Sequence, residues 1–428
     1  MNFRTIRRRQ AMRSSLWPIP LVCVVIAFAM AELAYFLDRE IAQEGTGWYL
    51  FVGDTESARV VVSTIATSML TFTGLVFTVT MLVLQLASNQ LSPRVIRTFL
   101  RDRYTQLVLG VFIATFLYAL LVLRRITSEP AGEPFVPALS VWLALLFVML
   151  SVGLFVYYIH HMTQAMRPSF VMHGIAAEAR DAIDHDYPPG AVGTTGPVPD
   201  GQRTSTVVLS PGPSGVLTGV DEERIIRVAL RTDCVIELRA CVGDFVREAG
   251  PLFTIHGSWD GSGERDLRGA VSFSPTRTMI QDVAFGFREL VDIAARALSP
   301  GINDPTTAVQ AIDHLHGLLA LLAPKPFPPS RRAVGGELVA IFLRMDWPDY
   351  VALACDEIRR SGQEQIQVHR RLRAMLLDLR EIAPVDRRAA LEEQLGLLDE
   401  SAQKEFHRPE LARATTPSAQ GQGPGEER

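Results

Sequence analysis

The amino-acid sequence predicts a mainly α-helical integral membrane protein. Four transmembrane helices are expected first, followed by a cytosolic α+β region with a small β module and a helical bundle. Three observations support this fold class. Hydrophobic residues make up 48% of the 428 residues, and the mean hydropathy is +0.17. Apolar segments of the roughly 20 residues that cross a bilayer are confined to the N-terminal part. Further on, short β-forming runs give way to amphipathic helical patterns.

The apolar segments define a transmembrane domain that we place at residues 1–170. The first segment is too long for the apolar core of a signal peptide and is not followed by a small-residue cleavage signal, so we expect it to be retained. The predicted spans are Leu16 to Leu37, Val60 to Ala87, Leu107 to Leu123 and Val136 to Ile159.

The charges of the loops predict the orientation of these spans. Five arginines precede the first span and four follow the second, whereas the loop between these two spans is mainly acidic. Positive charge marks the cytoplasmic side of a membrane, so both termini are expected in the cytoplasm. The arginines are Arg4, Arg7, Arg8, Arg9 and Arg13, then Arg94, Arg97, Arg101 and Arg103.

A polar stripe runs along the second span. Small and hydroxyl-bearing residues on one helix face allow close packing against another helix, and a threonine hydroxyl is inexpensive to bury because it bonds back to its own helix. The same stripe could instead line a pore, although it holds no charged residue of the kind that usually marks a charge-coupled pathway. Its residues are Thr64, Thr67, Thr71, Gly74, Thr78 and Gln85.

The region after the spans is predicted to hold four parts. Residues 171–203 read as a short helix and a Pro/Gly-rich linker, and residues 204–275 as the small β module. In that module, residues 206–209, 215–220, 235–239 and 252–255 have the pattern of strands, and Asp221 is expected to cap a helix over residues 221–230. Residues 276–400 form the helical domain and residues 401–428 a disordered tail.

The helical domain begins with two helices joined at a tight corner. The first is predicted from Thr278 to Leu298, with its apolar face buried, and ends where Gly301 is free to take a positive φ. Asp304 is a favoured N-cap and Pro305 a favoured first residue for the second helix. Later helices are predicted over residues 337–345, 349–361, 364–380 and 387–398.

The corner SPGINDPTT permits two interpretations. It forms a well-capped connection between helices, and it also presents a helix N-terminus that favours anions. Thr306, Thr307 and Arg296 could assist there, but the carboxylate of Asp304 already occupies the helix end. Alternatively, oxygen ligands could hold a hard cation. The candidates for that role are Asp282, Asp292, Asn303 and Asp304.

The same stretch resembles a known family. QDVAFGFRELVDIAARALSPGINDPTTA is similar to the hallmark block of the bacterial membrane proteins called domain of unknown function 2254. TFTGLVFTVTMLVLQLASNQLSPRVI and GDFVREAGPL resemble two further blocks of that family. The resemblance implies a multi-helix protein of the inner membrane with a cytosolic C-terminal domain, and it implies no agreed activity, cofactor or catalytic residue. Arg277, Gln281 and Asp282 match family-like positions and become candidates for a ligand site.

The sequence contains no phosphate-binding loop, dinucleotide fingerprint, serine-hydrolase elbow or zinc-spaced Cys/His set. We therefore expect no enzymatic activity, catalytic residue, metal or cofactor. A net charge of −4 gives no reason to expect nucleic acid as a partner. The expected partners are the lipid bilayer and further copies of the chain. Two functions remain open: an oligomeric channel or transport-type protein with a regulatory domain, or a membrane-anchored sensor or scaffold that binds a small ligand or a protein partner.

Overall fold

The computed structural model describes residues 17–43, 54–90, 102–126, 136–165, 167–188, 205–210 and 212–418. The chain divides into two compact units, residues 1–167 and residues 168–428. The arginines that predicted the orientation at residues 4–13 and 94–101 lie outside the described residues, as does most of the predicted linker. The orientation of the spans therefore stays a prediction.

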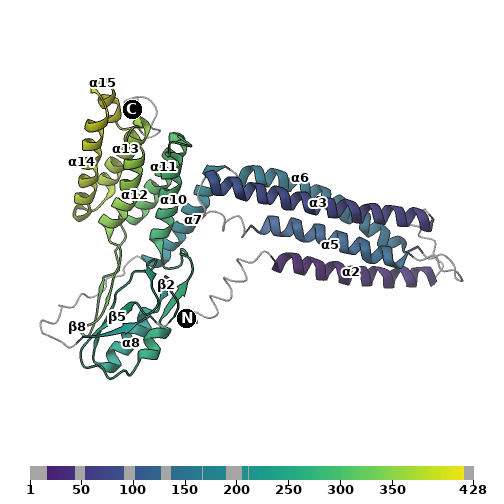
Figure 1. The fold of residues 1–428 in the computed structure, drawn as a ribbon, viewed down its shortest axis with the longest axis horizontal. Helices are drawn as coiled ribbons and strands as arrows, with labels where there is room; N and C mark the ends of the chain where they lie inside the picture. Colours follow the sequence, from purple (N-terminus) through teal and green to yellow (C-terminus); the bar gives the residue numbers. More distant parts are fainter. Residues whose placement is uncertain are drawn as a thin grey trace. The chain divides into compact units, whose positions relative to one another are not determined.

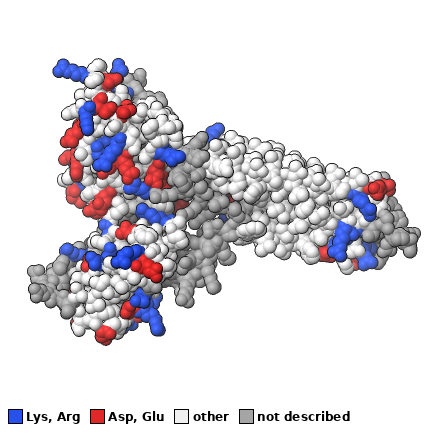
Figure 2. All heavy atoms as spheres, in the orientation of Figure 1, with Lys and Arg blue, Asp and Glu red and all other residues white. Residues whose placement is uncertain are grey.

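The first unit is a bundle of four long helices that run alongside one another (Figure 1). Each is long and apolar enough to cross a membrane, which confirms the predicted membrane-protein class. On the face drawn in Figure 2, the bundle is nearly free of charged atoms along its length. The helices are α2 (Pro18–Gln43), α3 (Thr55–Gln90), α5 (Arg103–Arg125) and α6 (Ala138–Ala165).

Helix α5 is the centre of the bundle. It contacts α2, α3 and α6 and is the most buried of the four helices. A Cβ atom at Gly110 would lie 2.9 Å from the Sγ atom of Cys23 and 3.0 Å from the Cα atom of Pro20. The absence of a side chain at Gly110 thus lets α2 and α5 pack closely, as small residues do in membrane helices.

Polar side chains connect the helices at one end of the bundle. The buried Asp38 carboxylate on α2 accepts hydrogen bonds from the backbone N–H groups of Leu139, at 2.8 Å, and Ser140, at 3.1 Å, and so caps the start of α6. Arg125 forms an ion pair with Glu32 and donates to the carbonyl of Ala31 at 2.6 Å. Glu32 of α2 therefore has a partner on the neighbouring helix α5.

Asp102 connects helices at the start of α5. Its carboxylate accepts from the backbone N–H groups of Tyr104 and Thr105, each at 3.2 Å, and therefore caps this helix. The Nε2 atom of His161, on α6, lies 3.0 Å from the same carboxylate. His161 thus has a structural partner in the bundle.

The second unit contains two sheets. The strand order is β1-β5-β3-β8-β7 in the larger sheet and β4-β2-β6 in the smaller one. Neighbouring strands are antiparallel except β3 and β8, which are parallel. The strands are β1 (Ser205–Leu209), β2 (Gly215–Val220), β3 (Val235–Leu238), β4 (Phe245–Val246), β5 (Pro251–His256), β6 (Val271–Ser274), β7 (Arg331–Val334) and β8 (Glu337–Phe342).

Two helices accompany the sheets. The first, α8 (Glu222–Thr232), begins after Asp221, whose side chain accepts from the N–H of Arg224 at 3.0 Å, as the predicted cap requires. Ile225 and Val228 of this helix are buried in one apolar core with residues of both sheets. The second helix, α9 (Glu264–Gly269), is a short connection before β6.

The remaining helices pack against one another in the second unit. α7 contacts α10 and α11, and a Cβ atom at Gly286 would lie only 2.6 Å from the Cβ atom of Ala179, so α7 and α10 are in close contact. The apolar face predicted for α10 is buried, including Phe287 and Leu290. The helices are α7 (Pro168–Asp186), α10 (Val283–Ala297), α11 (Pro305–Leu322), α12 (Trp347–Ser361), α13 (Ile366–Ile382), η1 (Val385–Arg387), α14 (Arg388–Glu405) and α15 (Arg408–Ala414).

The helix predicted over residues 337–345 is wrong. Residues 337–342 form strand β8, which pairs with β3 in the register of Ile236 opposite Ala340. A short apolar run is compatible with either structure, and pairing with a distant strand decides between them. Gly335 and Gly336, with φ of 64° and 88°, supply the turn from β7 into β8.

The start of the central helical pair also differs from the prediction. α10 begins at Val283 rather than at Thr278, because Gln281 takes a φ of 55° and Asp282 caps the helix. At the corner, the left-handed residue is Asn303, with a φ of 49°, and not Gly301. Asparagine tolerates this conformation better than most residues.

The C-terminal part is more ordered than its composition predicted. α14 continues to Glu405 and α15 follows, although a disordered tail was expected from residue 401. A small apolar cluster explains the difference, because Phe406 and Ala402 pack with Ile366 and Leu411. Residues 419–428 lie outside the described residues.

Candidate functional site

A cavity of about 360 Å³ lies in the C-terminal unit, where α7 ends, α10 begins and strands of both sheets approach. This volume is within the range of small-molecule sites, roughly 300–1,000 Å³. The acidic and basic lining residues are His185, Asp186, Glu222, Asp282, Arg332 and Arg344. The others include Tyr187, Val220, Leu238, Ala240, Cys241, Val242, Gln281, Val283, Ala284, Phe342, Leu343, Met345 and Tyr350.

Asp282 forms the best-connected ion pair of the cavity wall. Its oxygens accept from Nε and Nη2 of Arg277, each at 2.9 Å, and Oδ1 also accepts from the backbone N–H of Phe285 at 3.1 Å. The residue is only 4% exposed. Burial raises the pKa of the Asp282 carboxyl against the opposing effect of the Arg277 hydrogen bonds. This pair also starts α10, because the same carboxylate is its N-cap.

The backbone around this pair leaves little room for other side chains. Gly243 has a φ of 100°, and a Cβ atom there would lie 2.6 Å from Oδ2 of Asp282 and 2.7 Å from Nη2 of Arg277. Gln281 is held by the end of β2, since its Oε1 accepts from the N–H of Val220 at 2.9 Å and its Nε2 donates to the carbonyl of Val220 at 3.3 Å. The structure thus brings together Arg277, Gln281 and Asp282, the three candidates taken from the family resemblance.

A second set of charges lies at the start of α8. Glu222 forms an ion pair with Arg344, and the Nε atom of Arg332 lies 3.8 Å from its carboxylate. The Nε atom of Arg344 is buried and has no hydrogen-bond partner among the described residues. An unpaired buried donor is costly, so a ligand that accepts from it would gain binding energy.

Asp186, the last residue of α7, differs from the other carboxylates of the cavity. No hydrogen bond or ion pair of its side chain is found within the described part of the chain. Burial raises the pKa of this carboxyl to about 6, with Asp282 and Glu222 adding repulsion and His185 and Arg344 opposing the shift. A desolvated carboxylate without a partner is a strong candidate for contact with a ligand.

Two tyrosines and one cysteine complete the polar lining. The hydroxyls of Tyr187 and Tyr350 lie 3.0 Å apart and share one hydrogen bond. Burial raises the pKa of both phenols, so they stay neutral at physiological pH. Burial also raises the pKa of the Cys241 thiol to about 11, which argues against a reactive thiolate there.

The corner between α10 and α11 forms a capped connection. Asp304 accepts from the N–H of Thr307 at 3.1 Å and from its hydroxyl at 2.5 Å, while Gln365 donates to the side chain of Asn303 at 3.2 Å. The carboxylate of Asp304 therefore occupies the N-terminus of α11, which is the position that an anion would need. Thr306 is exposed beside it.

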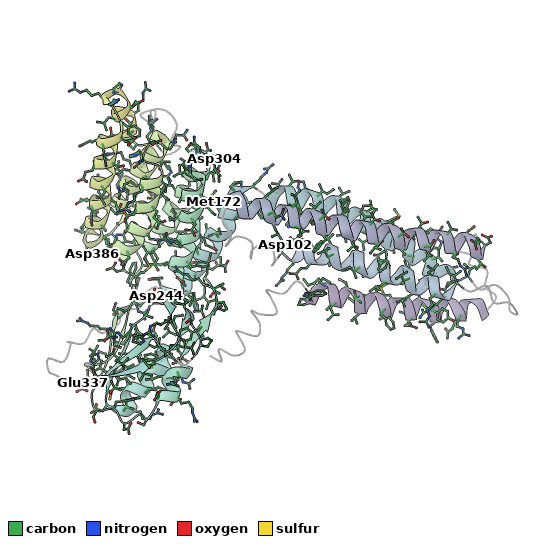
Figure 3. The ribbon with its side chains drawn as sticks, in the orientation of Figure 1. Asp102, Met172, Asp244, Asp304, Glu337 and Asp386 are labelled. Atoms are coloured by element: carbon green, nitrogen blue, oxygen red, sulfur yellow. The ribbon has the colours of Figure 1, made fainter. Side chains whose placement is uncertain are left out.

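The four oxygen ligands considered for a cation are not brought together. Asp282 caps the start of α10 and Asp304 caps the start of α11, so the 15 helical residues of α10, about 22 Å in length, lie between them. In Figure 3, Asp304 lies at one end of the helices and Asp244, which follows Gly243, at the other. Asp292 is half-buried in the middle of α10 and Arg296 is exposed near its end. The described residues contain no group of three or more His, Cys, Asp or Glu that could hold a metal ion.

The polar stripe of α3 is exposed in the isolated bundle. Four of its threonine hydroxyls donate to backbone carbonyls of their own helix: Thr64 to Val60 at 2.8 Å, Thr67 to Ser63 at 3.0 Å, Thr71 to Thr67 at 3.1 Å and Thr78 to Gly74 at 2.9 Å. Gly74 and Gln85 are exposed as well. The stripe therefore faces away from the other described helices of the bundle.

Several residues of the cavity could not be found from the sequence. Asp186 ends a helix without any motif around it, Glu222 reads as an ordinary first-turn residue, and Arg344 lies in a segment mistaken for a helix. Only the fold brings them to one place. The family-like positions Gln281 and Asp282 were the one signal in the sequence that pointed to this cavity.

Comparison with known proteins agrees with the architecture. The chain is 32% identical over 420 residues to uncharacterised proteins of Mycobacterium bovis and Mycobacterium tuberculosis, covering 94% of this chain and 79% of theirs. No solved structure matches. The family model described as "Predicted membrane protein (DUF2254)" matches residues 13–378. The chain therefore belongs to the DUF2254 family of membrane proteins, as the sequence blocks around the central helices indicated.

Proposed function

We propose that this protein is a membrane-anchored sensor whose C-terminal unit binds a small ligand in the cavity between α7, α10 and the sheets. One observation carries the proposal: the helix that supplies Asp186 to the cavity follows directly after the last membrane-spanning helix. α6 ends at Ala165 and α7 begins at Pro168. With the orientation expected from the arginines, the ligand would come from the cytoplasm of a bacterial cell.

The packing of α7 supports a role in transmission. Its middle is in close contact with α10 at Ala179 and Gly286. Near its C-terminal end, Nζ of Lys325 donates to Asp184 at 2.8 Å and to the carbonyl of Tyr187 at 3.4 Å. A ligand that changes the contacts at the end of α7 therefore acts on a helix that is packed along its length. The ligand can shift this helix only by binding one of its positions more tightly than another.

The test measures ligand binding and its effect on α7 in the full chain, purified in detergent. Thermal unfolding is recorded with a panel of cationic, anionic and neutral metabolites. A ligand of the cavity should stabilise the wild type and the control variant Ala389→Phe, which changes an exposed residue of α14. It should not stabilise Ala240→Phe, in which the new ring occupies the cavity.

Hydrogen exchange then tests transmission. With the stabilising ligand bound, amide exchange should slow in α7 and change in α6. If no member of the panel stabilises the wild type, the proposal fails. If a ligand binds but exchange in both helices is unchanged, the cavity binds a ligand without the proposed signal.

A second candidate function is an oligomeric channel or transport-type protein, and the exposed stripe of α3 favours it. Copies of α3 meeting around an axis would cover the stripe. This function ranks second because the threonine hydroxyls already donate hydrogen bonds to their own helix. They can therefore face lipid without an unsatisfied donor, and they do not require a water-filled pore. Ion flux into liposomes tests it: wild type should conduct, and joint replacement of Thr67, Thr71 and Thr78 by leucine should change the flux. Absence of flux in the wild type excludes this function.

A further inference from the structure

We infer that the ligand of the cavity carries a positively charged nitrogen group, an ammonium or a guanidinium, that pairs with the carboxylate of Asp186. This inference rests on the proposed function, since it names the chemical class of ligand for the same site. It follows from how the charges of the cavity are already paired.

Among the described lining residues, Asp186 is the carboxylate for which no ion pair is found, although Arg344 acts on it at longer range. Asp282 accepts from Nε and Nη2 of Arg277, and Glu222 pairs with Arg344, with Arg332 nearby. A cation that enters the cavity can therefore pair with Asp186 without breaking an existing ion pair. An anion could accept from the buried Nε atom of Arg344, but the Nη2 atom of the same guanidinium already pairs with Glu222. The anion would then lie close to the carboxylates of Asp186 and Glu222, which is costly in a partly desolvated site.

The remaining lining fits the body of an organic cation better than a bare metal ion. Leu238, Val283 and Phe342 offer apolar surface, and Tyr350 adds an aromatic ring that can contact a cation. The described residues also lack the cluster of three or more metal-ligating side chains that a dehydrated ion requires.

The pKa of Asp186, raised to about 6 by burial, gives the inference a second consequence. A bound cation stabilises the charged form of the carboxylate and lowers its pKa. Binding at pH 6 should therefore release a fraction of a proton. The affinity should also fall as the pH decreases below about 6, because protonated Asp186 no longer attracts a cation.

The experiment uses the full chain in detergent and isothermal titration with matched probes. Agmatine, putrescine and choline represent the cations, succinate and inorganic phosphate the anions, and glycerol a neutral compound. At least one of the cationic probes should bind. The anionic probes and the neutral probe should not bind. Asp186→Asn should weaken that binding roughly ten- to hundredfold, the loss expected for a hydrogen bond to a charged group. Asp181→Asn, on an exposed position of the same helix, should leave it unchanged.

Proton release keeps the test decisive if the Asp186 variant fails to fold, because it is measured on the wild type by titration in two buffers of different ionisation enthalpy. His185 also lines the cavity, so the pH profile is measured again in His185→Gln. Loss of the proton release in that variant would assign the release to His185 and overturn this part of the inference. Arg344, Asp282 and Glu222 are the other charged groups around Asp186 and are left intact.

Three outcomes separate the two hypotheses. Binding of a cation with proton release and loss in Asp186→Asn supports the inference. Binding of an anionic or neutral probe that is abolished in Ala240→Phe but unaffected in Asp186→Asn overturns it and leaves the proposed ligand-binding function standing. If no probe of any charge binds, both fail.

Discussion

The ion pair between Arg277 and Asp282 should make a large contribution to the stability of the C-terminal unit. Asp282→Asn tests it, because asparagine has the same shape and is an equally good N-cap. The substitution should keep the bond from the N–H of Phe285, at 3.1 Å, but it replaces one acceptor oxygen by an NH2 donor that faces the Arg277 N–H groups now bonded at 2.9 Å. This donor–donor contact makes the variant less stable even though burial raises the pKa of Asp282. Any loss of stability is then assigned to the ion pair rather than to the helix cap.

The expected magnitude follows from these contacts. A hydrogen bond to a charged group contributes about 1.5–3 kcal/mol. Because the Arg277 side chain is 27% exposed and can be rehydrated in the variant, we count the pair of bonds as one, which gives about 2–3 kcal/mol. For a unit of this size, 1 kcal/mol corresponds to about 2–4 °C in the melting temperature, so the expected decrease is about 4–12 °C.

Asp304→Asn is the matched control. Asp304 caps α11 in the same way, accepting from the N–H of Thr307 at 3.1 Å, but the contacts found for its side chain in the described chain are to Thr307 and not to an arginine. Its replacement should lower the melting temperature by less than about 2 °C. Both variants are compared by calorimetry of the full chain in detergent. Equal decreases in the two variants would refute the argument, since the ion pair would then add nothing to the cap.

Two further predictions concern the crowding at Gly243 and the protonation of Asp186. Gly243→Ala should lower the stability by at least about 1–3 kcal/mol, because its φ of 100° strains an alanine and the new Cβ would lie 2.6 Å from Asp282. Gly317→Ala in α11, where nothing lies within 4 Å of the new Cβ atom, should instead stabilise the protein by about 0.5–1 kcal/mol. The free energies of unfolding of both variants are measured with denaturant. A Gly243→Ala variant more stable than Gly317→Ala would contradict the crowding argument. Asp186 has a folded-state pKa raised from 3.8 to about 6, so its protonated form stabilises the fold below pH 4, and this contribution is lost as the pH rises through 6. Asp186→Asn should therefore be more stable than wild type at pH 7, by about 1–2 kcal/mol after allowance for partial exposure. The difference should vanish at pH 4. Melting temperatures are measured across this range, and a variant that is less stable than wild type at pH 7 would refute the prediction.

Local sequence patterns were sufficient wherever the structure depends on local chemistry. The four membrane helices follow from apolar length alone, because a bilayer requires about 20 residues whose backbone groups are satisfied within the helix. Asp221 and Asp304 were identified as caps because a carboxylate one residue before a helix bonds to a nearby N–H group. The buried face of α10 followed from its helical period.

Local patterns failed where a distant partner decides the conformation. Strand β8 was mistaken for a helix because its short apolar run gains strand geometry only by pairing with β3. The early start predicted for α10 was wrong because Gln281 is held in a left-handed conformation beside the end of β2. The cluster around Phe406, which orders the region of α15, is formed with Ile366 from another helix.

The candidate site shows the same division. The sequence by itself determined the membrane class and the family, and it made Arg277, Gln281 and Asp282 candidates for a ligand site. Only the tertiary structure decided that Gln281 and Asp282 line a cavity, and that Asp186 lines it as well without an ion pair to any described residue. The physical reason is that pairing and desolvation of a charge depend on which side chains the fold brings close, and residues 186, 222, 282 and 344 lie too far apart in the chain for any local pattern to show that they meet.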